Sequence, residues 1–178
     1  EGQFPVYARL QVLLARKFSS PGAIDGRSGL NTTKALSAYQ IMQGLSGNGK
    51  FDRQTWQALN QDNTTAAFIE YTLTARDIQQ PYAKSIPNNY AEQAKMKGLY
   101  YTRITEMLAE KFHMDEIFLQ QINPSAKFNQ IGEKIIVANI SNELPKDIYT
   151  LVAHKGTRQL FIFNAQNKII AAFPATIG

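Results

Sequence analysis

Residues 24–29 read Ile-Asp-Gly-Arg-Ser-Gly, a short polar stretch with two glycines. Aspartate and glycine both tolerate left-handed backbone angles, so we expect a tight turn here. Apolar residues recur at helical spacing on both sides of it, over 5–18 before the turn and up to Met42 after it. Asn31 or Thr32 can cap the second of these helices. The stretch therefore predicts the corner between two short helices that pack against each other.

A third helix is expected after a second glycine-rich turn. Gly44 fits a left-handed stop for the preceding helix, and residues 46–50 form the turn. Asp52 can then cap a helix whose inner face carries Trp56 and Leu59. Three short helices joined by glycine loops predict a small helical bundle.

The order of the residues in this bundle resembles the peptidoglycan-binding domain found in many wall hydrolases and transpeptidases. The link over residues 17–23 is looser than is usual in that family. The resemblance rests on Leu10-Gln11, Leu14, Ile24-Asp25-Gly26, Gly29-x-x-Thr32, Ala35, Tyr39-Gln40, Gly44-Leu45, Gly49 and Thr55-Trp56-x-x-Leu59.

The resemblance implies a groove near the Asp-Gly turn and the second helix, with peptidoglycan as its ligand. A glycan or stem peptide would need hydrogen-bonding groups and an apolar face there. A plainer interpretation stays open, in which the Asp-Gly pair only shapes a turn and Tyr39 and Trp56 are core aromatics. The candidate ligand-binding residues are Asp25, Gly26, Arg27, Asn31 and Tyr39.

The middle of the chain predicts two strands and two helices. Residues 61–65 are polar and indicate a linker, and residues 77–91, with two prolines, indicate a loop. The expected elements are a strand over 68–74, a helix over 103–112 capped by Thr102, a helix capped by Asp115 that runs to Ile122 and stops at Asn123-Pro124, and a strand over 134–140.

This middle region is similar to the second half of a LysM module, a family that binds glycans containing N-acetylglucosamine. In place of the family's usual Gly-Asp-Thr, the chain has Arg103-Ile104-Thr105. That loop helps form the sugar site in the family, so the resemblance implies the fold more strongly than the binding. It rests on residues 107–112, Leu119, Ile122-Asn123-Pro124 and Gly132-Glu133-Lys134-Ile135-Ile136-Val137.

The last part of the chain predicts three short strands after a polar linker over 141–146. The strands are expected over 148–154, 159–163 and 168–173, with a turn over 164–167. This stretch resembles the opening of an L,D-transpeptidase catalytic domain, through Leu151-Val152, Arg158-Gln159-Leu160, Phe163 and Phe173-Pro174-Ala175-Thr176-Ile177-Gly178. The family's catalytic histidine and nucleophilic cysteine lie further downstream, so no catalytic residue is assigned.

The composition of the chain excludes several kinds of functional site. The 178 residues include no cysteine, so disulfides, cysteine-bound zinc and a cysteine nucleophile are excluded for the sequence as it stands. The two histidines, His113 and His154, are far apart and make a weak metal signal, so neither metal nor cofactor is expected. The net charge of +5 favours anionic partners, but the basic residues are scattered and nucleic acid is not expected.

No apolar run is long enough for a transmembrane helix, and residues 1–5 do not resemble a signal peptide. The resemblances imply an extracytoplasmic location, in the periplasm or the cell wall. An unfinished sheet edge at the end of the chain could also pair with another copy as a homo-oligomer.

Together these signals predict an α+β protein in three parts. They are a helical peptidoglycan-binding domain over 1–62, a linker strand plus a LysM-like βααβ module over 63–143, and the truncated start of an L,D-transpeptidase β domain over 144–178. The leading hypothesis is a peptidoglycan-binding region that recruits an L,D-transpeptidase. The alternatives are an active L,D-transpeptidase, if a downstream cysteine-containing segment exists, and a structural or partner-binding protein without glycan affinity.

Overall fold

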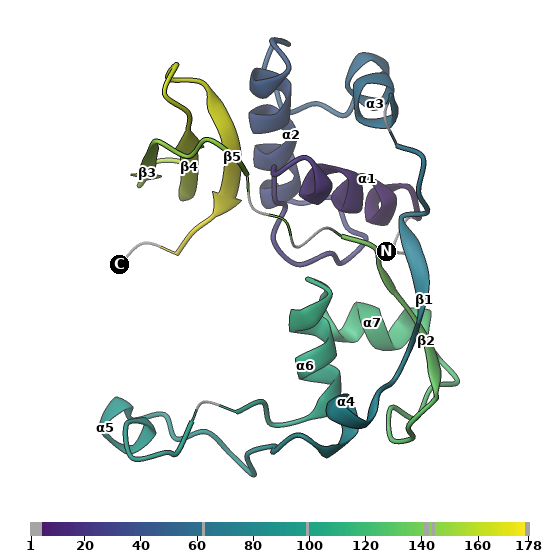
Figure 1. The fold of residues 1–178 in the computed structure, drawn as a ribbon. Coiled ribbons are helices and arrows are strands. Elements are labelled where there is room, and N and C mark those ends of the chain that lie inside the picture. Colours follow the sequence, from purple (N-terminus) through teal and green to yellow (C-terminus); the bar gives the residue numbers. More distant parts are fainter. Residues whose placement is uncertain (1–4, 62, 99, 141–142, 144, 177–178) are drawn as a thin grey trace. The chain divides into compact units, whose positions relative to one another are not determined.

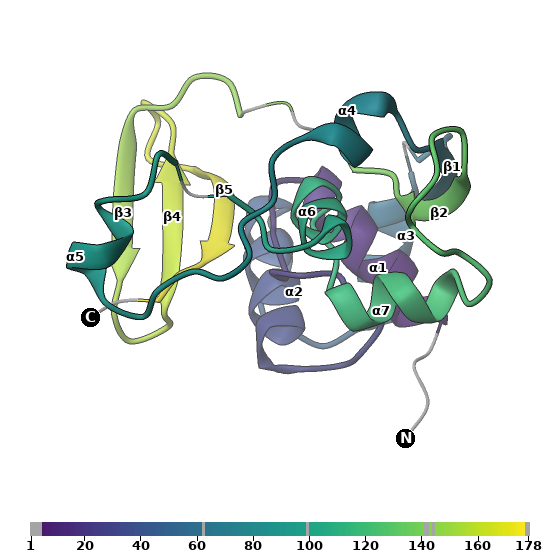
Figure 2. The ribbon, with the colours of Figure 1, turned by 90° about the horizontal axis from the view of Figure 1, so that it is seen from below.

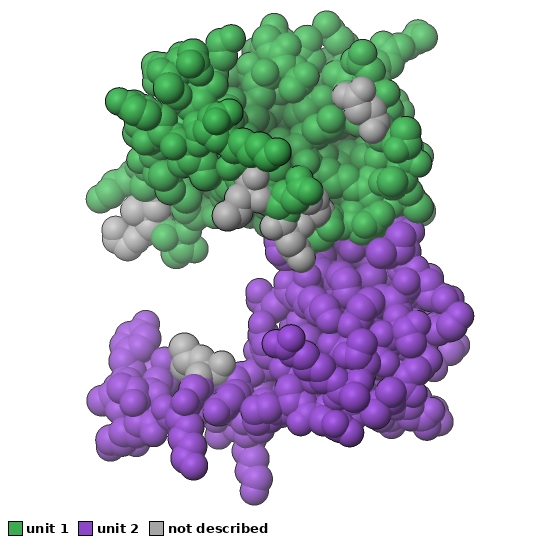
Figure 3. Space-filling model, in the orientation of Figure 1, with its two compact units in different colours: residues 1–67, 139–178 green, residues 68–138 purple. Residues whose placement is uncertain are grey.

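The computed structural model describes residues 5–61, 63–98, 100–140, 143 and 145–176. The chain forms two compact units (Figure 3). Unit 1 comprises residues 1–67 and 139–178, and unit 2 comprises residues 68–138. Helices accompany two small antiparallel sheets, which confirms the α+β class.

Unit 1 opens with the expected bundle of three helices (Figure 1), α1 (Pro5–Arg16), α2 (Leu30–Met42) and α3 (Arg53–Asn60). Full burial of each large apolar side chain stabilises a fold by about 1.5–3 kcal/mol, so this small core suffices to hold the helices together. Trp56 lies half-buried at its edge, with its ring 5.4 Å from that of Phe51. The buried core residues are Leu10, Leu13, Leu14, Ala35, Leu36, Tyr39 and Leu59.

Two helix ends differ from the sequence-based expectation. Helix α1 ends at Arg16, before Phe18, because Phe18 has a left-handed φ of 58°. The expectation that Asn31 or Thr32 caps α2 is wrong. The N-cap residue is Gly29, which has no side chain to offer, and the Thr32 hydroxyl is engaged elsewhere.

The cap of α3 is confirmed. Asp52 accepts a hydrogen bond from Thr55 N at 2.8 Å, which satisfies one of the free N–H groups of the first turn. Gly44 follows α2 with a φ of 70°, as expected for a left-handed helix stop.

A three-stranded antiparallel sheet completes unit 1. Its strands are β3 (Thr150–His154), β4 (Gln159–Phe163) and β5 (Ile169–Pro174), in the order β3-β4-β5. Strand β5 lies beside α2 in both views (Figures 1 and 2). Ala172 N donates to Phe18 O, and Ser20 N donates to Ala172 O, each at 2.8 Å. The segment after α1 therefore pairs with β5 and holds the sheet against the bundle.

Unit 2 is built on an antiparallel pair of strands, β1 (Phe68–Thr72) and β2 (Lys134–Ala138), with α6 (Ile104–Lys111) and α7 (Glu116–Ile122) between them in sequence. Asn123 ties the end of α7 to β2, because its amide donates to Leu119 O and Ile136 O and accepts from Ile136 N. The Asn-Pro stop is thus also a structural link. The Asp115 cap of α7 is confirmed, since its carboxylate accepts from Phe118 N at 2.9 Å.

The segment over 77–91, expected to be largely loop, is loop over 80–89. Helices α4 (Ala75–Gln79) and α5 (Tyr90–Gln93) overlap its two ends. Thr74 and Asp77 form a reciprocal capping box at the start of α4, which stabilises a short helix where the prolines suggested none.

Candidate functional site

A buried glutamine fixes the turn at residues 25–27, which we call the first glycine turn. Gln11, on α1, is only 1% exposed. Its amide oxygen accepts from Asp25 N at 3.1 Å and from Gly26 N at 2.9 Å. Its amide nitrogen donates to the Asp25 carboxylate at 2.8 Å and to Arg27 O at 3.1 Å. The backbone of this turn is therefore held from inside the bundle.

A second turn, at residues 48–50, repeats this arrangement and is called the second glycine turn. The amide oxygen of buried Gln40, on α2, accepts from Gly49 N at 2.8 Å. Its amide nitrogen donates to Lys50 O at 3.0 Å and to the Thr55 hydroxyl at 2.9 Å. Gln11 likewise reaches a threonine of the following helix, Thr32, at 3.3 Å. The bundle thus holds two equivalent turns.

The side chain at the start of each turn has the same role. The Asp25 carboxylate accepts from Arg27 N at 2.9 Å, and Asn48 Oδ1 accepts from Lys50 N at 2.8 Å. Segments 25–32 and 48–55 consequently align without a gap, as Asp/Asn, Gly, a basic residue and, five positions later, Thr. This internal repeat was readable in the sequence and was not recognised there.

Both turns carry an exposed basic side chain, Arg27 in the first and Lys50 in the second. Gly49 has a φ of 69°, and a Cβ there would lie 2.8 Å from Thr33 O, so the second turn packs tightly against α2. The first turn leads into α2, which begins at Leu30 and exposes its second residue, Asn31. The first turn is distinguished by Asn31, which follows it and also lines a groove of unit 1.

Four of the five residues expected to bind ligand lie in this region. Asp25, Gly26 and Arg27 form the first glycine turn, and Asn31 lies in the first turn of α2. Tyr39 lies apart from them in the bundle core, with 1% of its surface exposed. Its burial matches the plainer interpretation of this ring as a core aromatic.

A groove of about 910 Å³ begins at Asn31 and runs to the three-stranded sheet of the same unit. One wall comes from α2, and the other comes from the turn between β3 and β4 and from the end of β5. Its lining residues are Leu30, Asn31, Lys34, Gly156, Thr157, Arg158, Pro174, Ala175 and Thr176.

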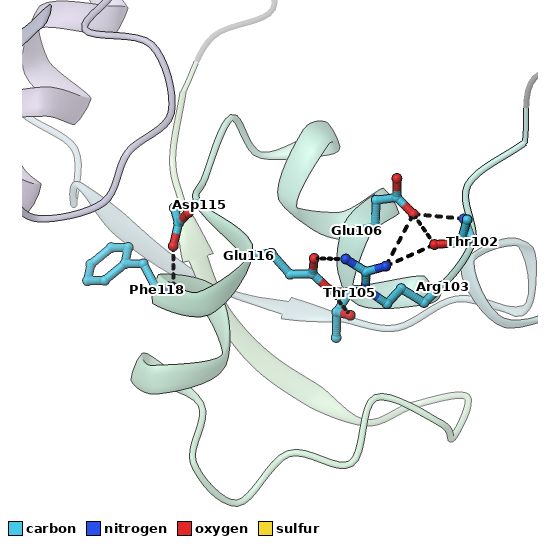
Figure 4. A network of polar contacts seen from close by, with 7 residues as sticks. All are labelled: Thr102, Arg103, Thr105, Glu106, Asp115, Glu116 and Phe118. Atoms are coloured by element: carbon cyan, nitrogen blue, oxygen red, sulfur yellow. Dashed lines mark hydrogen bonds and ion pairs between the residues drawn. The ribbon is translucent and has the colours of Figure 1, made fainter. Parts of the chain in front are cut away.

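In unit 2, the loop that departs from the LysM pattern is held by ion pairs (Figure 4). The Arg103 guanidinium binds the Glu116 carboxylate through two hydrogen bonds, of 2.6 and 2.5 Å, and Thr105 donates to the same carboxylate. Thr102 donates to Glu106 through both its backbone N–H and its hydroxyl. Hydrogen bonds from Arg103 lower the pKa of Glu116, and those from Thr102 lower the pKa of Glu106. The loop is thus fastened to α6 and α7 by its own polar groups.

A second polar network in unit 2 surrounds Asp77, whose side chain is buried. Burial by itself disfavours its charged form. Hydrogen bonds from Thr74 N, the Tyr71 hydroxyl, the Thr74 hydroxyl and the Lys111 ammonium outweigh that effect and lower the pKa of Asp77 to about 2. Lys111 also lies over the Tyr71 ring, 4.4 Å from its centroid. These contacts give the network a structural role, joining β1, α4 and α6.

Neither histidine belongs to a metal centre in the part of the chain that the structure describes, where no three His, Asp or Glu side chains form a cluster able to hold an ion. His154 accepts from Thr157 N at 3.1 Å, and His113 has a left-handed φ of 52° after α6. Among the described helices, none combines the length and the apolar character needed to cross a bilayer.

Comparison with known protein families finds a match that falls on the helical bundle. A family model described as "Putative peptidoglycan binding domain" matches residues 7–59, which run from α1 through both glycine turns to α3. No curated protein matches the chain. The match indicates peptidoglycan as a partner and an association with the cell wall. The N-terminal helical bundle of unit 1 is therefore the part of the chain that is similar to this peptidoglycan-binding family.

Proposed function

We propose that the first glycine turn and the start of α2 are the part of the helical domain that contacts peptidoglycan, and that this contact brings an L,D-transpeptidase to its substrate. The observation that carries the proposal is the family match over 7–59, which coincides with the bundle. The matched segment contains two equivalent turns, and the first of them carries exposed Arg27 and leads to Asn31, which lines a groove.

The chemistry of the first glycine turn suits a polar polymer. Gln11 holds the backbone of the turn, so the backbone position to which the Arg27 side chain is attached is fixed. Guanidinium and amide groups donate several hydrogen bonds each, which suits the hydroxyl, amide and carboxylate oxygens of peptidoglycan. A preorganised turn loses little conformational entropy when it binds.

Co-sedimentation with purified, insoluble peptidoglycan sacculi at low salt tests this proposal. The paired substitution Arg27→Ala and Asn31→Ala should lower the bound fraction severalfold. The control pair Arg53→Ala and Gln57→Ala removes a similar cation and amide from exposed positions of α3 and should leave binding unchanged. Equal binding by both pairs would contradict the assignment of the site.

We also propose that unit 2 is a LysM-like module that contacts the glycan strand. Its support is the order of β1, α6, α7 and β2, with the two strands paired antiparallel. Two weak sites on one chain raise each other's effective concentration, so weak single sites can still localise a protein on a polymer. Titration with chitooligosaccharides should then shift amide signals over residues 103–105.

The Arg103–Glu116 pair favours a second candidate, in which unit 2 is a structural or partner-binding scaffold. The polar groups of the loop already bind each other, so a sugar would have to displace those bonds. Absence of amide shifts with chitooligosaccharides, while sacculi still bind the chain, would favour the scaffold.

The link to an L,D-transpeptidase rests on the resemblance of residues 151–178, and the three parts over 1–62, 63–143 and 144–178 are proposed as its modules. Catalysis would need a thiolate nucleophile and a base, and the sequence contains no cysteine. The intact mass of the protein isolated from its native source, together with thiol labelling, tests the link. A mass near 20.0 kDa without a labelled thiol would contradict it, and a larger mass with one labelled thiol would support it.

A further inference from the structure

The groove between α2 and the three-stranded sheet is built from segments far apart in the sequence. Lys34 lies on α2, Arg158 in the turn before β4, and Pro174 at the end of β5. Gly22 packs beside Pro174, since a Cβ at this glycine would lie 3.5 Å from Pro174 Cγ. The pairing of residues 18–20 with Ala172 fixes the walls. The groove is therefore a feature of this combination of bundle and sheet.

The charge in the groove is of one sign. Lys34 and Arg158 contribute cations, and no acidic residue lines it among the residues that the structure describes. In that same part of the chain, neither cation has an ion-pair partner. The amide of Asn31 and the hydroxyls of Thr157 and Thr176 add hydrogen-bonding groups. A lining of this kind attracts an anion and can satisfy its oxygens.

The backbone holds Arg158 in place from two sides. Its N–H donates to Lys155 O at 3.2 Å, and its carbonyl accepts from Ala175 N at 3.0 Å. Its φ of 52° is left-handed, which is uncommon for a residue with a side chain. A left-handed residue is common in the connection of a β-hairpin, and here it ends the turn between β3 and β4. The Arg158 side chain therefore starts from a fixed point at the rim of the groove.

We infer that this groove binds the carboxylate groups of a peptidoglycan stem peptide. The inference rests on the proposed function, because it names the part of peptidoglycan that the chain would recognise. Glycan strands offer mainly hydroxyls and amides, whereas stem peptides carry free carboxylates that match Lys34 and Arg158. A volume of about 910 Å³ is enough for a short extended peptide. The openness of the groove to solvent suits a polar ligand that remains attached to a polymer.

The test uses the whole chain and a soluble probe, the tripeptide L-alanyl-γ-D-glutamyl-meso-diaminopimelate with both amino groups acetylated, and the fully amidated form of the same acetylated tripeptide as the neutral counterpart. Titration followed by amide shifts should give saturable changes at Asn31, Lys34 and Arg158 with the acid. The amidated tripeptide should bind about tenfold more weakly, since the ion pairs are lost. An N-acetylglucosamine tetramer should leave these three signals unmoved.

Matched variants separate the groove from general electrostatics. Lys34→Gln with Arg158→Gln should weaken binding of the tripeptide about tenfold. Lys50→Gln with Lys168→Gln removes the same charge at exposed positions outside the groove and should change it by less than about twofold. Circular dichroism of each variant checks that it is folded.

Equal loss in both double variants would overturn the assignment of the groove, as would equal affinity for the acid and the amide. Binding of the unaltered chain to sacculi is measured in parallel with tripeptide binding. The two results together distinguish the proposal about the groove from the proposed function. Retained sacculus binding without tripeptide binding overturns the groove and leaves the proposed function standing. Saturable tripeptide binding without sacculus binding supports the groove and contradicts the proposed function.

Discussion

Replacement of Gln11 by methionine should both destabilise the bundle and weaken its binding to peptidoglycan. Methionine has a similar length but neither accepts from Asp25 N and Gly26 N nor donates to Arg27 O. The glutamine makes five hydrogen bonds, and its side chain is buried. A lost hydrogen bond costs about 1 kcal/mol net, and an unsatisfied buried N–H costs about 1–3 kcal/mol. We therefore expect a loss of about 2–4 kcal/mol in the free energy of unfolding.

The assay is guanidinium unfolding followed by tryptophan fluorescence. The chain has one tryptophan, Trp56, and it packs on Phe51 within the bundle, so its emission reports on this domain. Small domains are stable by about 5–15 kcal/mol, so the variant should remain folded in the absence of denaturant. A change below about 0.5 kcal/mol would refute the role given to Gln11, because buried groups cannot lose these partners at so small a cost.

Gln40→Met is the matched control, because Gln40 holds the second glycine turn in the same way with three hydrogen bonds. It should also destabilise the bundle, by about 1–3 kcal/mol. Its binding to sacculi should nevertheless stay near that of the unaltered chain, since the first glycine turn is untouched. The Gln11→Met variant should bind severalfold less to sacculi than the unaltered chain. Equal binding by the two folded variants would show that the first turn is not the contact surface.

Three further outcomes follow from local geometry. The stabilisation that Asp77 gives unit 2 should be fully present above pH 3.8, the ordinary pKa of aspartate, and should be lost as the pH falls toward about 2. The free energy of unfolding should change by about 2 kcal/mol over this range, which hydrogen exchange of unit 2 can follow. The Asp77→Asn variant should not show this pH dependence. Gly49→Ala should lower the midpoint of thermal unfolding more than Gly44→Ala. Both glycines have a left-handed φ, but only a Cβ at position 49 would meet a backbone oxygen, Thr33 O, at 2.8 Å. Equal losses in the two variants would contradict this reasoning. Gly29→Asp should stabilise the bundle by about 0.5–1 kcal/mol, because nothing lies within 4 Å of a Cβ there and α2 lacks a side-chain cap; a lower midpoint of unfolding would show that the cap does not form.

The sequence predicted best what short-range patterns determine. The caps at Asp52 and Asp115, the stop at Gly44 and the strand over 159–163 all depend on neighbours within a few residues, and the structure confirms each. The capping box of Thr74 was equally readable, but the prolines that follow favoured a loop.

Long-range side-chain pairings were not predictable in this way. Gln11 and Asp25 are fourteen positions apart, and only the folded bundle shows that the first fixes the second. The groove depends on the docking of β5 against α2, and apolar periodicity says nothing about which surfaces meet. The burial of Tyr39 agrees with the plainer interpretation of the sequence, a core aromatic on the apolar face of α2, whereas the resemblance suggested a ligand contact.

One experiment maps directly where peptidoglycan touches the chain. Backbone amide signals of the 178-residue protein would be recorded with and without soluble peptidoglycan fragments released from sacculi by a muramidase. We expect saturable shifts that concentrate over residues 25–31, with the signals of the second glycine turn at 48–50 unchanged. Shifts confined to unit 2, or none at saturating fragment, would contradict the claim that the helical domain binds peptidoglycan through its first glycine turn.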